Sequence, residues 1–163
     1  MKKRKVLISI ISIALCFLCS FSTVSANDIY TGDYFEFDNP FSRMDSDGTF
    51  TFCIASRIES DVFTADKAYV TIGTTASVYD RSEREEFTSS SDTYAYTVKL
   101  MKYSTGSMVG SYTAYSDGTR YGQSYSVKKG DKYYLEIVAV NRNLKLTSYQ
   151  IDGTGYVKNV TVD

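Results

Sequence analysis

Histidine is absent from all 163 residues, which removes most of the side-chain chemistry that enzymes use. Ser-His-Asp sites, Cys-His sites and His-ligated zinc sites all need an imidazole, so the sequence excludes them. Carboxylates are plentiful, but most lie in expected turns. Glu136 is embedded in the apolar run 132–140, where it is either an outward strand residue or a buried acid with a raised pKa. No catalytic residue is predicted, and a small carboxylate-dependent hydrolase is kept as an alternative.

The run Asp45-Ser46-Asp47-Gly48 is similar to the start of a calcium loop. It lacks the further spaced ligands and the distal Glu of an EF-hand, so an ordinary turn capped by Asp side chains is the main interpretation. Calcium binding at Asp45 and Asp47 is left open. No metal site and no cofactor are predicted.

Tyrosine is the remaining residue type with binding chemistry, and the chain has 15. Its ring packs on sugars or apolar protein surfaces, and its hydroxyl hydrogen-bonds. Tyr69 and Tyr79 bracket the outward Thr and Ser residues of one expected strand, and Tyr115 stands at the end of another hydroxyl-rich face. We predict that Tyr115, or the pair Tyr69 and Tyr79, contacts an extracellular glycan or protein. The alternative is that these rings belong to an ordinary solvated sheet face.

The segments that must position these residues alternate apolar and polar residues with a period of two, as strands do. The predicted inward residues are Phe50, Phe52, Ile54 and Ile58 in one strand and Ala68, Val70, Ile72, Ala76 and Val78 in another. Eight or nine such strands recur at intervals of about ten residues. The sequence therefore predicts an all-β fold, an antiparallel β-sandwich of the jelly-roll or Ig-like kind.

Asp-Gly dipeptides at 47–48, 117–118 and 152–153 mark expected turns between strands. The polar segment 80–92 is long for a compact domain, and we expect it to be a mobile surface loop. A short helix over 81–87 is the alternative.

The strongest local prediction is a hairpin across the turn 117–118, with Gly110 opposite Tyr125. A preceding loop that ends in Gly106 sets Leu100 opposite Gly110, so that one apolar face continues across three strands. The outer face of this hairpin would be small and hydroxyl-rich, with Ser111, Thr113, Gly122, Ser124 and Ser126.

The first 26 residues have the composition of a secretory signal peptide, with a very basic start that is typical of bacteria. An apolar run covers 6–18, and Val24-Ser25-Ala26 supplies small residues for cleavage before Asn27. The run is short for crossing a bilayer, although an uncleaved anchor is the alternative. We expect a signal peptide at 1–26 and a single secreted domain at 27–163, outside the cell or associated with its surface.

Without the first 26 residues the chain carries 14 basic and 19 acidic groups, a net charge of −5. This balance argues against nucleic acid and anionic membrane surfaces as partners, and no stable membrane insertion is expected after cleavage. Cys16 and Cys19 leave with the signal peptide, so Cys53 has no partner for an internal disulfide. Cys53 is interpreted as a half-buried strand residue.

Two patterns stand out in 94–162: Tyr94-x-Tyr96-x-Val98-x-Leu100, and the run 127–137 with its Lys-Lys-Gly-Asp turn and Tyr-rich strand. They resemble the closing strands of bacterial pre-peptidase C-terminal domains and similar secreted β-sandwich modules. The resemblance implies a non-catalytic accessory domain that assists substrate binding or secretion. We therefore expect a secreted, non-enzymatic binding module. A bacteriocin-like, toxin-like or inhibitory protein is the alternative.

Overall fold

The computed structural model describes residues 44–87, 93–141, 144 and 147–163. The predicted signal peptide and the expected new terminus Asn27 lie outside these residues, so cleavage and secretion stay predictions. The regular elements of the described part are β-strands, and no helix within it is long and apolar enough to cross a membrane.

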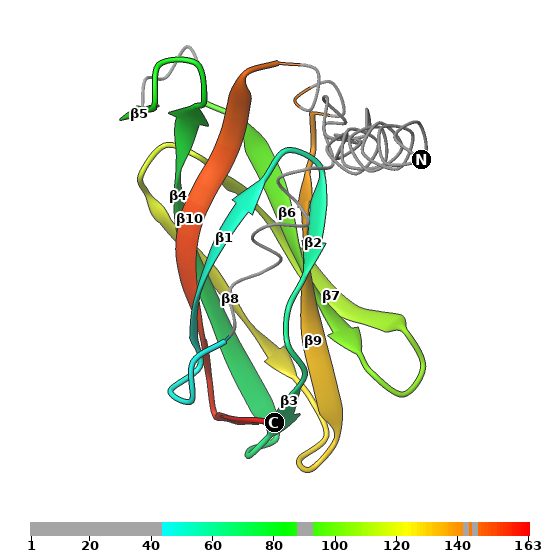
Figure 1. Cartoon of the computed structure of the whole chain (residues 1–163). Helices are drawn as coiled ribbons and strands as arrows, with labels where there is room; N and C mark the ends of the chain where they lie inside the picture. The colour runs from blue at the N-terminus through cyan, green and yellow to red at the C-terminus, as the bar shows by residue number, and fades with distance from the viewer. Residues whose placement is uncertain (1–43, 88–92, 142–143, 145–146) are drawn as a thin grey trace, which may run out of the picture. The chain divides into compact units, whose positions relative to one another are not determined.

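The strands form two antiparallel sheets, which we call sheet A and sheet B (Figure 1). Sheet A contains β1 (Thr49–Ile54), β4 (Tyr69–Asp80), β5 (Glu85–Phe87), β8 (Arg120–Ser126) and β10 (Tyr149–Lys158). In sheet A, β10 lies between β1 and β4, and the other side of β4 pairs with both β8 and β5.

Sheet B contains β2 (Arg57–Glu59), β3 (Phe63–Ala65), β6 (Ala95–Lys102), β7 (Ser107–Tyr115), β9 (Lys132–Ala139) and β11 (Val160–Val162). Here β9 lies between β6 and the short strands β2 and β3, while β7 pairs with the far side of β6. The strand β11 pairs with β3.

The strand order identifies the kind of sandwich. We count β2 and β3 as one interrupted strand and leave out the short strands β5 and β11, which leaves eight strands in chain order. In sheet A the order of these strands is then first, eighth, third, sixth, that is β1, β10, β4 and β8. Sheet B has the second strand next to the seventh, then the fourth and the fifth. This is the order of a jelly roll, in which the chain passes repeatedly between two sheets. The predicted antiparallel β-sandwich is confirmed, in its jelly-roll form.

The core lies between the sheets and is formed by residues at the alternating positions. The rings of Phe52 in β1 and Tyr96 in β6 meet across the two sheets with their centroids 5.5 Å apart. Thr74 is the polar member of this core, and its hydroxyl lies 3.0 Å from the hydroxyls of both Tyr96 and Tyr112. These three hydroxyls therefore satisfy one another. Ala68, which was predicted to face inward, is exposed just before β4.

The predicted strand 49–58 is in fact two strands. Its apolar residues are buried as predicted, but the chain bends at Ala55 and Ser56, so that β1 belongs to sheet A and β2 to sheet B. The Ser56 carbonyl accepts a hydrogen bond of 2.7 Å from the Ala139 N–H, which anchors the bend to β9. An alternating pattern is therefore compatible with a change of sheet.

The strand β10 runs straight through Asp152-Gly153, where the sequence predicted a turn. Gly153 and Gly155 lie opposite Phe52 and Phe50 of β1. A Cβ atom would lie 2.5 Å from the Phe52 ring at Gly153 and 2.3 Å from the Phe50 ring at Gly155. These glycines admit two core rings instead of reversing the chain.

The predicted hairpin between 107–115 and 119–127 does not form, because β7 pairs with β6 in sheet B and β8 pairs with β4 in sheet A. The dipeptide Asp117-Gly118 does turn, and Gly118 has φ +76°. However, the Gly118 N–H donates to the Ala76 carbonyl of β4 at 2.9 Å, which carries the chain into sheet A.

The hairpin between β6 and β7 has the predicted register as far as Leu100, after which the register shifts by one residue, so that Met101 faces Met108 and not Val109. Leu100 faces Gly110 and Val98 faces Tyr112, and Gly106 takes the left-handed conformation with φ +64°. Gly110 is also in contact with Tyr125, as we predicted from the hairpin across the turn 117–118. A Cβ atom at Gly110 would lie 2.4 Å from the ring, but this contact joins the two sheets instead of neighbouring strands.

The polar segment after β4 contains the strand β5, not the short helix considered for 81–87. The turn before β5 is closed by Arg84, with φ +59°, whose N–H donates to the Asp80 carbonyl at 2.7 Å. Glu86 of β5 then faces Tyr79 of β4. Residues 88–92 lie outside the described residues, and the mobility of this segment stays a prediction.

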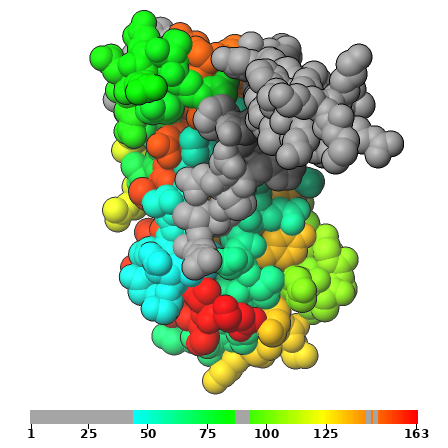
Figure 2. Space-filling model, viewed as in Figure 1, coloured from blue at the N-terminus to red at the C-terminus, as the bar shows by residue number. Residues whose placement is uncertain are grey.

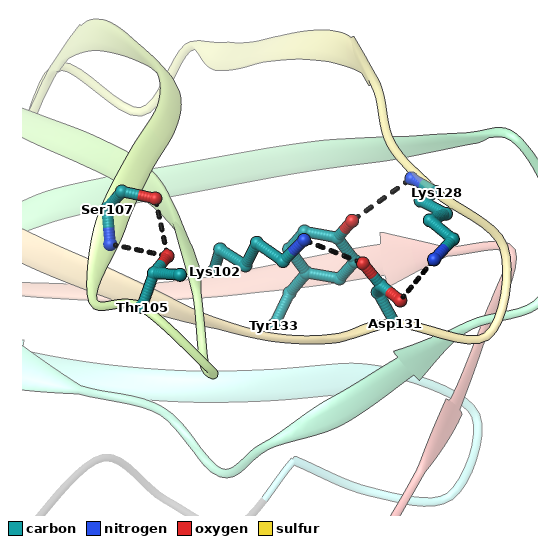
Figure 3. Close-up of polar contacts among 6 residues, drawn as sticks. All are labelled: Lys102, Thr105, Ser107, Lys128, Asp131 and Tyr133. Carbon is teal, nitrogen blue, oxygen red and sulfur yellow. Dashed lines mark hydrogen bonds and ion pairs between the residues drawn. The ribbon is translucent and has the colours of Figure 1, made fainter.

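An ionic link joins two loops at one end of the sandwich (Figure 3). The Lys102 Nζ, at the end of β6, lies 2.7 Å from Asp131 Oδ2 in the β8–β9 connection. The Lys128 Nζ lies 3.6 Å from the other carboxylate oxygen, and the Lys128 N–H donates to the Tyr133 hydroxyl at 3.0 Å. The connection after β8 is therefore tied to both β6 and β9.

Candidate ligand-binding face of sheet A

The outer face of sheet A brings together side chains from four strands. Directly opposed residues of antiparallel strands lie on the same face, so the register places Tyr156 of β10 between Thr49 of β1 and Gly73 of β4. Gly73 in turn lies opposite Gly122 of β8. A tyrosine therefore stands beside two successive positions that have no side chain.

The ring of Tyr156 occupies the space above Gly73. A Cβ atom at Gly73 would lie 2.5 Å from Cζ, 2.6 Å from Cε1 and 2.6 Å from the hydroxyl of this ring. The ring therefore leans across β4, and only glycine at position 73 permits that orientation.

Two cationic side chains flank the same ring. The Lys158 Nζ lies 4.9 Å from the ring centroid of Tyr156, and the Arg120 Cζ lies 5.9 Å from it, both within the range of cation–π attraction. Neither cation forms an ion pair with a residue in the described part of the chain. Their charges are therefore available to a ligand.

Two shallow depressions border Tyr156 and Arg120. The first has a volume of about 310 Å³ and is rich in hydroxyl groups, with Thr49, Thr51, Thr75 and Thr154 in its lining and Asp45 as its carboxylate. The second extends over Thr71, Gly122 and Ser124. We call this surface, formed by Tyr156, Arg120, Lys158 and these neighbouring residues, the Tyr156 face.

The three tyrosines that the sequence predicted as ligand contacts do not lie together. Tyr69 and Tyr79 lie on the outer face of sheet A, but at opposite ends of β4, about 33 Å apart at 3.3 Å per residue. Tyr69 lies at the end that carries the Tyr156 face, two positions before Thr71. Tyr115 lies on sheet B, with its ring centroid 5.9 Å from that of Tyr121.

The hydroxyl-rich face predicted for the hairpin is divided between the two sheets. Ser111 and Thr113 lie on the outer face of sheet B. Gly122, Ser124 and Ser126 lie on sheet A, where Ser124 and Thr71 hydroxyls are 2.8 Å apart. The β8 half of the predicted surface therefore joins the outer face of β4.

The far end of the outer face of sheet A is acidic. Burial, and secondarily the Glu86 carboxylate, raise the pKa of Asp152. The Ser77 hydroxyl donates to Glu86 at 3.1 Å, and Asp152 lies opposite both Ser77 and Cys53. The face thus changes from basic at Tyr156 to acidic near Cys53.

Cys53 is a half-buried strand residue, as predicted. Its Sγ donates to the Gln150 Oε1 at 3.3 Å. Burial, and then the Asp152 carboxylate, raise the pKa of the thiol to about 12. The thiol is therefore protonated and not a nucleophile at neutral pH.

Glu136 is an outward strand residue, the first of the two interpretations that the sequence left open. It lies on the outer face of sheet B, yet only 9% of it is exposed, because neighbouring strands cover it. Its Oε1 lies 3.4 Å from the Lys99 Nζ and 3.7 Å from an Arg57 nitrogen. The carboxylate forms ion pairs with both cations, and its role is therefore structural.

Asp45 and Asp47 form the predicted capped turn before β1. Asp47 Oδ1 accepts hydrogen bonds from the Thr49 N–H at 2.9 Å and the Thr49 hydroxyl at 2.6 Å, and the Gly48 N–H donates to the Asp45 carbonyl at 2.7 Å. Figure 2 shows this turn in cyan beside the red C-terminal residues. Among the described residues there is no group of three Cys, Asp or Glu side chains arranged to hold a metal ion.

Sequence reasoning missed Tyr156, Arg120 and Lys158. Tyr156 and Lys158 are two positions apart and therefore share a face of β10, so the sequence contained half of the signal. Their proximity to Arg120 depends on β4 lying between β8 and β10, and that pairing cannot be deduced from local patterns.

No family model matches the chain, and no curated protein matches it. Among solved structures, "CBM4 structure and function" aligns with 13% identity and a TM-score of 0.34, over 71% of this chain and 59% of that one. The lysozyme inhibitor PliG from Aeromonas hydrophila gives 10% identity and a TM-score of 0.38, over 71% and 87%. The xylan-binding domain CBM22-1 of Paenibacillus barcinonensis Xyn10C gives 8% and 0.37, over 74% and 69%.

This chain spans less than two thirds of the CBM4 structure. None of these three structures is a pre-peptidase C-terminal domain, and that resemblance stays a prediction. Because the identities are so low, what this protein binds has to be argued from its own surface.

Proposed function

We propose that this protein is a secreted, non-enzymatic module that binds an extracellular glycan on the Tyr156 face. The observation that carries the proposal is a tyrosine ring, positioned by Gly73, between two depressions lined largely by hydroxyl groups. An aromatic ring packs against the apolar face of a sugar. Threonine and serine hydroxyls both donate and accept, as the sugar hydroxyls on the other side require.

The charges on this face favour a sugar that carries a negative group. Arg120 and Lys158 stand beside the ring with no ion pair to a described residue, so they can contact a carboxylate or sulfate of a sugar that stacks on Tyr156. Ion pairs with arginine are charge-assisted and often bidentate. The acidic groups near Cys53 are remote from this contact, so the preferred ligand is an acidic oligosaccharide at the basic end of the face.

The site is suited to binding and not to hydrolysis of a glycosidic bond. That reaction generally uses two carboxyl groups on either side of the bond. Among the described residues that line the two depressions, Asp45 is the single carboxylate. The geometry therefore holds a sugar without supplying the acid and base.

The test is a titration of the purified protein with oligogalacturonate, a sulfated oligosaccharide and a neutral xylo-oligosaccharide, followed by calorimetry and amide chemical shifts. We expect acidic oligosaccharides to bind more tightly at low salt, with shifts at residues of the Tyr156 face. Tyr156→Ala should weaken binding about fivefold, since a stacked ring contributes on the order of 1 kcal/mol. Arg120→Gln should reduce the preference for acidic over neutral sugars.

Tyr103→Ala is the matched control, because Tyr103 is an exposed tyrosine in the β6–β7 loop of sheet B. It should leave affinity unchanged. The proposal is wrong if none of the three glycans binds, or if the Tyr156 and Tyr103 variants bind equally well.

A further inference from the structure

Tyr69 is an exposed aromatic residue at the end of β4 that carries the Tyr156 face. Its side chain is 47% exposed. It lies on the same outer face of sheet A as Thr71 and Gly73, because residues two apart along a strand share a face. A second tyrosine ring is therefore accessible to a ligand that is bound on this face.

The rings of Tyr69 and Tyr156 lie along one strand. Tyr156 belongs to β10, but its ring covers Gly73 of β4. Tyr69 and Gly73 are four residues apart, which is about 13 Å along β4 at 3.3 Å per residue. A monosaccharide or a disaccharide is too short to stack on both rings. An oligosaccharide has to lie along β4 to reach from one ring to the other.

The surface between the two rings is low and carries hydroxyl groups. Thr71 lies midway between them, and its hydroxyl is 2.8 Å from the Ser124 hydroxyl of β8. Tyr69 itself pairs with Ser126, another small residue of β8. A depression with a volume of about 490 Å³ extends from Tyr156 to Thr71 and Ser124. The residues between the rings therefore leave room for a sugar chain and offer it hydrogen bonds.

The cation of Lys158 lies beside this path. Lys158 of β10 faces Thr71, and this is the last pair in the register of β10 with β4. The Lys158 Nζ lies 4.9 Å from the ring centroid of Tyr156. A negative group on the part of the sugar chain between the two rings would therefore meet an ammonium group.

We infer that an acidic oligosaccharide, at least a trisaccharide, lies along β4 with one unit on Tyr156, one on Tyr69 and a negative group between them at Lys158. This inference rests on the proposed function, since it assigns the direction and the minimum length of the ligand on the same face. Tyr69 is then the residue that makes the site prefer long chains to short ones.

The minimum length is tested by calorimetry with oligogalacturonates, sulfated oligosaccharides and xylo-oligosaccharides, each as a size series from disaccharide to pentasaccharide. We expect the affinity for the acidic series to rise about fivefold at the length that reaches Tyr69, which is the contribution of one more stacked ring. Amide shifts at Ser126 should appear only with these longer ligands.

Variants separate the two rings. Tyr69→Ala should remove the gain from length and leave the affinity for the disaccharide unchanged, whereas Tyr69→Phe should keep the gain because the ring remains. Lys158→Gln should bring the affinities for acidic and neutral pentasaccharides closer together. Tyr79→Ala is the matched control, since Tyr79 lies on the same face at the opposite end of β4, and it should not change the dependence on length.

The outcomes distinguish this inference from the proposed function. Binding that depends on Tyr156 but not on the length of the ligand overturns the inference and leaves the proposed function standing. The same holds if Tyr69→Ala binds pentasaccharides as well as the unaltered protein does, or if Tyr79→Ala loses the gain instead. Absence of binding in all three series overturns both.

Discussion

Cys53 illustrates how burial sets the reactivity of a single side chain. Its thiol pKa is raised to about 12 by burial and by the Asp152 carboxylate, and it donates a hydrogen bond to Gln150. We expect the folded protein, without residues 1–26, to react with a disulfide reagent at pH 8 far more slowly than the same chain in guanidinium. A folded protein that reacts as fast as the denatured one contradicts this assignment.

Asp152 should destabilise the fold when it is ionised. Its pKa is raised in the folded state, so its contribution to stability is present below its ordinary pKa of 3.8 and is lost as pH rises through the folded value. Asp152→Asn should therefore raise the melting temperature at pH 7 and change it little at pH 3. Glu83→Gln, in an exposed turn, is the control and should have little effect at either pH.

At the residue scale, local periodicity predicted burial well but did not reveal the surroundings of Tyr156. Alternation correctly assigned Phe50, Val70 and Leu100 to the core, because the period of a strand is a property of each segment alone. The surroundings of Tyr156 depend on Gly73, which is distant in the sequence and contributes no side chain. Such a site becomes visible only when the pairing of strands is known.

Among the elements, β10 depends on glycine to fit against β1. A Cβ atom at Gly155 would lie 2.3 Å from the Phe50 ring and 2.9 Å from the Gly73 carbonyl oxygen, so both strands would have to shift. We expect Gly155→Ala to lower the free energy of unfolding by about 1–3 kcal/mol, as overpacking of a core does. Thr154→Ala, at the exposed neighbouring position, should cost much less in the same urea titration.

The two loops in Figure 3 should lose their connection when the Asp131 charge is removed. The hydrogen bond and charge of Lys102 hold the pKa of Asp131 below 3.8, so this stabilisation exists above that pH and is lost as pH falls through the folded value. Asp131→Asn should therefore lower the melting temperature at pH 7, by an amount that disappears in acid. Lys129→Gln in the same connection is the control.

The hairpin that was predicted wrongly shows why elements are harder to assemble than to find. The pairing of large with small residues between 107–115 and 119–127 is real, since Tyr125 fills the space over Gly110. In a sandwich the same complementarity exists between stacked sheets as between neighbouring strands. The pattern therefore identified two residues that are in contact, but it did not show whether they lie on neighbouring strands of one sheet or on opposite sheets.

For the whole molecule, the lowered pKa values of several aspartates predict a loss of stability in acid. Hydrogen bonds or ion pairs lower the pKa of five aspartates below 3.8: Asp47, Asp80, Asp117, Asp131 and Asp163. Each contributes stability above that pH, and each contribution is lost as pH falls through the folded pKa. We expect melting temperatures, followed by circular dichroism, to be nearly constant from about pH 5 to 7 and to fall below about pH 4. A melting temperature that rises in acid would contradict this prediction.

The jelly-roll order also decides when the molecule can assemble during its synthesis. The strand β10 is inserted between β1 and β4, and Thr49 pairs with Tyr156 about 100 residues later in the chain. In sheet B, β9 is inserted in the same way between β6 and the early strands β2 and β3. A nascent chain that has reached β8 therefore holds strands with unfilled gaps at the centre of both sheets. Folding has to wait for the last quarter of the polypeptide, and a ribosome that stops early releases a chain missing the middle of its sheets, not their rim.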